Sequence, residues 1–167
     1  FMIPLGLSTA ATVRVGQAYA RQDGEGMRRA AIASLAIAAL IALGAALLIF
    51  IVPEKLVSLF LDKDNPNAAL VLATAVPLLF VGAGFQFFDG IQVTGVALLR
   101  GLKDTRTPMI MAVISYWLFG LPTAYLLGFV AGWGGPGIWM GLAIGLAGAA
   151  ILLNGRYYLL AKRLSFT

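Results

Sequence analysis

Long runs without a charged residue recur along this chain and limit the folds that it can adopt. The run over 30–52 is uncharged and rich in Ala, Ile and Leu. A helix needs about 20 apolar residues to cross the hydrocarbon core of a bilayer, so this run predicts a complete membrane-spanning helix. Hydrophobic residues make up 60% of the chain, against about 45 to 50% in a typical soluble domain. We therefore expect an all-α, polytopic transmembrane helix bundle.

Five apolar segments organise the chain into a single membrane domain over residues 1–167. The first reads as the closing part of a spanning helix, and the other four read as complete spans. Their predicted limits are 1–20, 30–52, 67–99, 108–130 and 138–160. The chain begins with Phe1 inside an apolar pattern that lacks the ordered regions of a signal peptide. We therefore interpret it as part of a longer protein.

Prolines and glycines mark where the predicted helices end or approach one another. Pro53 ends the second segment, and residues 56–61 form a short amphipathic stretch before the polar loop DKDNPN. In the last segment, small residues recur at Gly141, Gly145 and Gly148. Small residues let two membrane helices approach closely, so these glycines predict a face against which another helix packs.

The third segment is longer than a perpendicular crossing of the bilayer requires. We expect it to tilt or to bend, with Pro77 as the natural kink site and with Gly82 and Gly84 as further hinge positions.

Basic residues gather in alternate connections and at the end of the chain. They are Arg14, Arg21, Arg28, Arg29, Arg100, Lys103, Arg106, Arg156, Lys162 and Arg163. By the positive-inside rule, the side that carries them faces the cytoplasm. This topology explains the net charge of +5 better than a nucleic-acid surface does. The connection LRGLKDTRTP also suits anionic lipid headgroups, but orientation and helix capping account for its charges first.

One acidic residue, Asp89, lies in the middle of an apolar run of helical length. An isolated Asp there costs roughly 2.5 to 3.5 kcal/mol by insertion scales, and such residues are commonly functional. Helical spacing places Gln86 and Gln92 three residues before and after Asp89, on the same face. These three side chains are candidates for an ion or substrate site. The alternative is that Asp89 hydrogen-bonds to a neighbouring helix and only fixes packing.

The chain has no Cys and no His. Thiol nucleophiles, imidazole bases and the usual zinc sites are therefore excluded. A single acid inside the apolar runs cannot supply paired acid and base roles. We expect neither an enzyme nor a bound cofactor.

Several segments resemble the multidrug and toxic compound extrusion (MATE) transporters, closest to their bacterial NorM-type branch. The run FQFFDGIQVTGVALLRGLKDTRTPMIMAVISYWLFGLPTAYLLG resembles their tenth and eleventh transmembrane segments. The opening PLGLSTAATVRVGQAYA is similar to the eighth, and GWGGPGIWMGLAIGLAGAAILL to the twelfth. The resemblance implies twelve helices in two lobes and export of drugs by alternating access, driven by Na⁺ or H⁺. This chain would form most of the C-terminal lobe, with the N-terminal lobe absent.

The resemblance also implies roles for single residues. Asp89 matches the family's tenth-segment acid that takes part in cation coupling, and it would bind Na⁺ in a sodium-coupled member. Tyr116 is a candidate lining residue because NorM-type members present a similar Tyr-Trp pair. Phe85 is a further candidate, since aromatic rings can hold flat cationic drugs through cation–π contacts.

The implied partners are the bilayer of the bacterial inner membrane, cationic drugs and the missing N-terminal lobe. An alternative within the same superfamily is a flippase for lipid-linked oligosaccharides or a polysaccharide exporter. Such a protein needs a more cationic cavity, and Arg14 is the one basic residue that lies deep in a predicted helix. A membrane scaffold without transport activity is favoured only if Asp89 is tightly packed.

Overall fold

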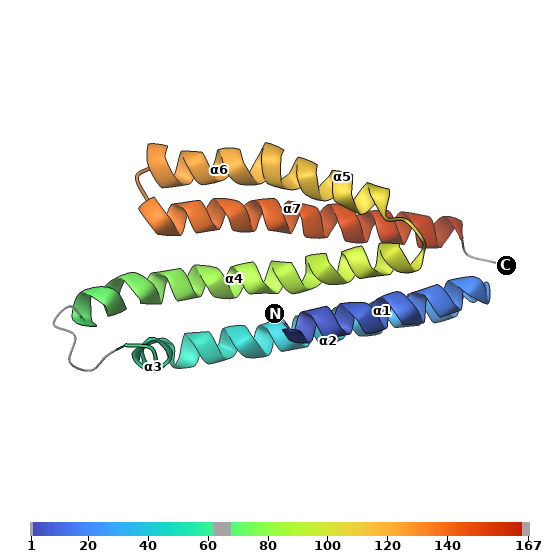
Figure 1. Cartoon of the computed structure of the whole chain (residues 1–167), viewed down its shortest axis with the longest axis horizontal. Helices are drawn as coiled ribbons and strands as arrows, with labels where there is room; N and C mark the ends of the chain where they lie inside the picture. The colour runs from blue at the N-terminus through green and yellow to red at the C-terminus, as the bar shows by residue number, and fades with distance from the viewer. Residues whose placement is uncertain (1, 62–67, 165–167) are drawn as a thin grey trace.

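The computed structural model describes residues 2–61 and 68–164, and these residues are helical apart from short turns (Figure 1). The elements are α1 (Met2–Ala20), α2 (Gly24–Ile51), α3 (Pro53–Ser58), α4 (Ala68–Gly101), α5 (Arg106–Ile114), η1 (Ser115–Gly120), α6 (Leu121–Tyr125), η2 (Leu126–Val130) and α7 (Gly134–Arg163). The predicted loop DKDNPN falls on residues 62–67, outside the described residues.

Four helical segments are long and apolar enough to cross a membrane, as the sequence predicts. They are Gly24–Ile51, Ala68–Gly101, Arg106–Val130 and Gly134–Arg163. Ahead of them, α1 supplies 19 residues. The expectation of one helix end and four complete spans is therefore confirmed.

The last helix begins earlier than predicted, at Gly134 instead of Ile138. Pro136 is its third residue, where a missing N–H does no harm because the first four amide groups of a helix have no partner inside it. The second helix likewise begins before the apolar run, because the Asp23 side chain accepts a hydrogen bond from the amide of Gly26 (2.7 Å) and caps the helix.

Two tight turns at one end of the bundle share the same backbone geometry. Gln22 lies two residues after the end of α1 and has a φ of 57°, and Lys103 lies two residues after the end of α4 and has a φ of 63°. In each turn the next amide bonds back across the helix end, from Asp23 to Ala18 (2.9 Å) and from Asp104 to Leu99 (3.0 Å). These are Schellman motifs, in which glycine is the usual residue at the left-handed position.

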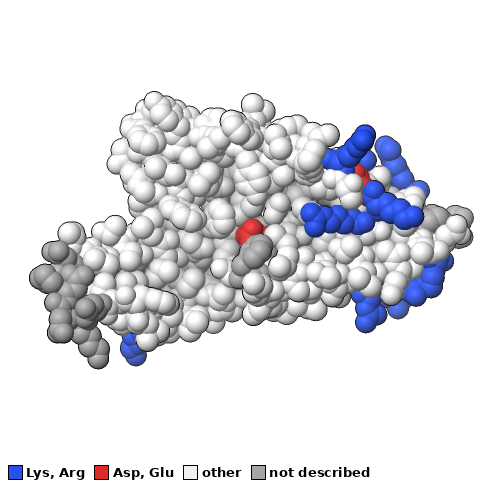
Figure 2. All heavy atoms as spheres, viewed as in Figure 1, with Lys and Arg blue, Asp and Glu red and all other residues white. Residues whose placement is uncertain are grey.

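Helix α4 is the centre of the bundle (Figure 1). It contacts α1 and α2 on one side and α7 on the other, and α7 in turn contacts the helix formed by α5, η1, α6 and η2. The α1–α2 turn, the α4–α5 turn and the end of α7 lie together at one end of the molecule. Basic side chains gather at this end, as Figure 2 shows. We call it the basic end.

The packed core lies in the half of the bundle towards the basic end. Its completely buried side chains include Val15, Met27, Leu98, Leu99 and Leu153. Helix α4 shows the asymmetry directly. Among the α4 residues before Asp89, one is buried, Ala83. Most α4 positions from Gly90 to Gly101 are buried. The first half of α4 is thus loosely covered by the described residues, and its second half is enclosed.

The predicted glycine face of α7 packs directly against backbone. A Cβ on Gly145 would lie 2.6 Å from the Cα of Gly120, and one on Gly141 would overlap the backbone of Ala124. A Cβ on Gly148 would meet the Ser115 Oγ at an ordinary 3.9 Å. Close packing is therefore confirmed at the first two glycines, which lie against η1 and α6.

One buried hydrogen bond ties α7 to α2. The hydroxyl of Tyr157, which is 6% exposed, donates to the backbone carbonyl of Met27 at 3.0 Å. We expect Tyr157→Phe to lower the free energy of unfolding by about 1 kcal/mol, the usual net value of such a bond. Tyr158→Phe is the matched control, because the neighbouring ring is 67% exposed. Thermal unfolding in detergent measures both, and equal stability of the two variants would contradict the prediction.

Candidate functional site

Asp89 is half-buried on α4, at the boundary between the loosely covered and the enclosed halves of the helix. Among the residues that the structure describes, none forms a hydrogen bond or ion pair with its side chain. The packing alternative considered above requires such a partner. The carboxylate is therefore available, within this part of the chain, for an ion or a proton.

The two glutamines predicted to flank Asp89 lie in different surroundings. Gln86 is exposed and lines a cavity, whereas Gln92 is 9% exposed and lies within the packed half of α4. Three residues turn a helix by about 300°, which is about 60° short of a full turn. Each step of three residues therefore moves the side chain about 60° around the helix axis. Over two such steps the predicted polar stripe passes from the surface into the interior.

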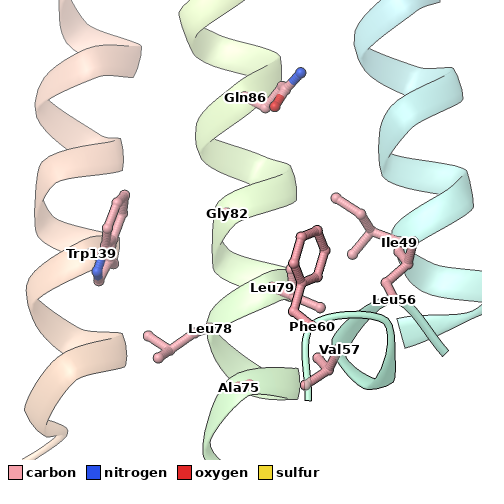
Figure 3. Close-up of a pocket in the computed structure, with 10 residues that line it drawn as sticks. All are labelled: Ile49, Leu56, Val57, Phe60, Ala75, Leu78, Leu79, Gly82, Gln86 and Trp139. Carbon is pink, nitrogen blue, oxygen red and sulfur yellow. The ribbon is translucent and has the colours of Figure 1, made fainter. Parts of the chain in front are cut away.

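An apolar cavity of about 630 Å³ lies between α4 and its neighbours, at the end of the bundle that carries α3. Its walls come from α2, α3, α4 and α7 (Figure 3). They are Ile49, Leu56, Val57, Phe60, Ala75, Leu78, Leu79, Gly82, Gln86 and Trp139. Sites for small molecules usually measure about 300 to 1,000 Å³ and are mainly apolar with a few polar groups. Gln86 supplies such a group here, one helical turn from Asp89.

Phe85 contacts α7 through an aromatic pair. Its ring meets Trp139 edge to face, with the ring centroids 5.6 Å apart and the planes at 78°. Trp139 also lines the cavity, and Figure 3 shows its ring directed towards α4. Sequence reasoning did not select Trp139. Its position on a glycine-rich helix was the available signal, but the pairing depends on how α7 packs against α4.

Tyr116 lies in η1, one of two π-helical turns in the helix that runs from α5 to η2. In η1 the amide of Leu121 bonds to the carbonyl of Tyr116, five residues back. Pro122 explains the widening, because its ring has no N–H and crowds the carbonyl four residues before it. Helix α7 packs against both η1, which carries Tyr116, and α4, which carries Asp89. The π-helical turns themselves were not predicted.

The predicted hinge residues lie in the loosely covered half of α4. The helix is continuous through Pro77. Gly82 lines the cavity, and a Cβ on either Gly82 or Gly84 would meet no atom within 4 Å. Their role as hinges stays a prediction. Within residues 2–61 and 68–164, no group of three His, Cys, Asp or Glu side chains could hold a metal ion.

Comparisons with known proteins give the family. The MatE family model matches residues 1–126. The chain belongs to the MatE family. A probable multidrug resistance protein NorM from Rhizobium meliloti is 47% identical over 165 residues, which cover 99% of this chain and 35% of that protein. The corresponding protein from Agrobacterium fabrum is 52% identical over 163 residues, covering 98% and 35%. This MatE chain thus spans about a third of the length of these relatives.

Solved structures of MATE transporters share the fold. An inward-facing multidrug resistance MATE transporter of the MOP superfamily superposes with a TM-score of 0.84 at 21% identity, covering 96% of this chain and 36% of that one. A eukaryotic MATE transporter gives a TM-score of 0.80 at 21% identity, covering 98% and 36%. The helix arrangement of the MatE chain is therefore that of one part of a MATE transporter.

Proposed function

We propose that this chain is most of the C-terminal lobe of a multidrug efflux antiporter that is coupled to Na⁺ or H⁺. The protein would export cationic, often aromatic compounds across the bacterial inner membrane by alternating access. Its partners would be the bilayer, the drugs and the N-terminal lobe of the same transporter. Membership of the MatE family and the likeness to NorM proteins support efflux transport. No catalytic reaction or cofactor is part of the proposal.

The observation that carries the proposal is the state of Asp89. A carboxylate in the middle of a spanning helix costs free energy, and its presence there suggests a function. Asp89 is only half-buried and has no polar partner among the described residues. Exchange of a proton or Na⁺ at Asp89 would therefore break no bond to these residues. A scaffold role needs a tightly packed Asp89 and is disfavoured for the same reason.

The position of Asp89 suggests how ion binding reaches the substrate. The residue lies where α4 leaves the packed core, and Gln86 on the next turn lines the cavity. A change of charge at Asp89 favours a different shape of the loosely covered half, with Pro77, Gly82 and Gly84 absorbing the bend. Ion binding and drug binding then compete through the shape of one helix, which is a two-state element biased by a local charge.

The cavity supports a substrate that is apolar, aromatic and of drug size. Its volume suits such a molecule, and Trp139 and Phe85 present aromatic rings beside it. A flippase or polysaccharide exporter of the same superfamily remains the second candidate. It is less well supported, because no basic residue is among the described residues that line the cavity, and Arg14 is exposed outside it.

The charge distribution supports one orientation in the membrane. Basic side chains gather at the basic end (Figure 2), while α3 at the opposite end carries Lys55 beside Glu54. By the positive-inside rule, the basic end faces the cytoplasm. The cavity would then lie in the outer half of the bilayer.

Efflux by a full-length transporter that carries this sequence tests the proposed function. The protein would be produced in a bacterial strain without its main drug pumps, and the loss of ethidium from preloaded cells would be followed by fluorescence. We expect efflux to depend on an imposed Na⁺ or H⁺ gradient and to stop when that gradient is collapsed. Efflux that is unaffected by both gradients would contradict ion coupling, and no efflux of any aromatic cation would contradict drug transport.

A further inference from the structure

A second cavity, of about 480 Å³, lies at the basic end, away from Asp89. It is bounded by the α4–α5 turn, the end of α1 and the end of α7. Its lining residues are Tyr19, Leu102, Lys103, Asp104, Thr107, Arg156, Leu160, Arg163 and Leu164. Apolar and charged side chains share its wall. This combination matches a molecule with an anionic head and an apolar body.

The charges in this cavity leave a net positive field. Lys103, Arg156 and Arg163 face a single carboxylate, that of Asp104. Asp104 is already engaged, because it accepts a hydrogen bond from the amide of Thr107 (3.2 Å) and pairs with the Arg156 Nε at 3.5 Å. That pair is long for a hydrogen bond, and both of its atoms are buried without a hydrogen-bond partner. Asp104 therefore neutralises at most one of the three cations, and Lys103 and Arg163 form no ion pair with the described residues.

Lys103 lies at a backbone position where glycine is the usual residue. Lys103 occupies the left-handed position of a Schellman motif, with a φ of 63°. Glycine adopts this conformation without strain, whereas a side chain with a Cβ is strained there. Gln22 has the same conformation in the α1–α2 turn and lines neither cavity, so this strain by itself does not indicate a ligand. At Lys103 the side chain is a cation that lines the cavity.

We propose that this cavity binds the phosphate of an anionic phospholipid headgroup, with Lys103, Arg156 and Arg163 as its cationic ligands. The cavity lies at the ends of two spanning helices, α4 and α7, which is the depth of the headgroups in a bilayer. Leu160 precedes Arg163 by one turn of α7, on the side of the membrane interior, and would contact the upper part of an acyl chain. A free phosphate ion would use the cationic side chains but not this apolar wall.

Native mass spectrometry of the full-length transporter tests the proposal. Binding of phosphatidylglycerol would be compared with that of phosphatidylcholine carrying the same acyl chains. We expect a preference for phosphatidylglycerol that falls about fivefold in Lys103→Gly and in Arg163→Gln, the effect of removing one basic side chain near an anionic lipid. Arg106→Gln is the matched control, since Arg106 is exposed on the same turn but does not line the cavity.

A second control separates charge from backbone. Gln22→Gly relieves the same left-handed strain as Lys103→Gly, but it removes no charge. Both variants should unfold at or above the wild-type temperature, while only Lys103→Gly loses the lipid preference. Equal phosphatidylglycerol binding by wild type and Lys103→Gly would overturn the proposal, as would equal binding of the two lipids. Stabilisation by inorganic phosphate as large as that by phosphatidylglycerol would show that free phosphate, not lipid, is the ligand.

Discussion

Asp89→Asn in a full-length transporter that carries this chain is expected to lower gradient-driven ethidium efflux about tenfold or more. Asparagine keeps the size and polarity of the side chain but cannot release a proton or offer a negative charge to Na⁺. The link between ion and drug is therefore lost, and coupling between two sites is typically worth about 5- to 150-fold. Because Asp89 has no hydrogen-bond or ion-pair partner among the described residues, the substitution breaks no bond within this part of the transporter, and we expect protein levels near wild type.

The matched control for this prediction is another acid in the same chain. Glu25 is exposed on the first turn of α2 and pairs with Arg28 (3.2 Å) and Arg29 (3.0 Å). Exposed pairs of this kind contribute little, so Glu25→Gln should transport like wild type. Efflux by Asp89→Asn at the wild-type rate, with the same ion dependence, would remove Asp89 from the coupling mechanism.

Gly145→Ala is expected to destabilise the bundle by about 2 to 3 kcal/mol, which is within the range for overpacking a core. The added Cβ would lie 2.6 Å from the Cα and 3.0 Å from the amide nitrogen of Gly120, and 3.2 Å from the carbonyl oxygen of Ser115. All three atoms belong to backbone, so no side-chain rotation relieves the overlap. The helices must separate, and η1, which carries Tyr116, must move with them.

Gly148→Ala provides a control of opposite sign on the same face of α7. Its Cβ would contact only the Ser115 Oγ, at 3.9 Å. Replacing a glycine inside a helix by alanine then gains about 0.5 to 1 kcal/mol of stability. Thermal unfolding of both variants in detergent measures the difference. A Gly145→Ala protein as stable as Gly148→Ala would show that α7 does not approach η1 as closely as described.

The predictions that the structure confirms depend on local properties of the sequence. The length of an uncharged run sets the length of a spanning helix, so the number of spans followed directly from the sequence. The glycine face of α7 followed from glycines spaced four and three residues apart, since close contact between membrane helices needs small residues. These features required no knowledge of which helices are neighbours.

The features that sequence reasoning missed depend on those neighbours. The burial of Gln92 results from the packed second half of α4, whereas its spacing from Asp89 alone predicted that the two side chains share one face. The contact between Phe85 and Trp139 joins two helices that are far apart in the sequence. The π-helical turn at Tyr116 combines a local cause, Pro122, with the close approach of Gly145 to Gly120.

Helix α4 has the geometry of a lever, because one half of its length is fixed in the core and the other half is loosely covered. The core holds α4 from Gly90 to Gly101, and this part is the clamp. The other part, the arm, runs from Ala68 to Asp89 and has one buried residue, Ala83, in the described structure. At 1.5 Å per residue this arm is about 30 Å long, so a tilt of roughly 10° at the clamp moves its tip by roughly 5 Å. The basic end would stay nearly in place in such a tilt, because α4 beyond Asp89 is held in the core. In the mechanism proposed above, a small change at Asp89 would thus be geometrically amplified at the far end of the bundle, where the cavity that Gln86 lines lies.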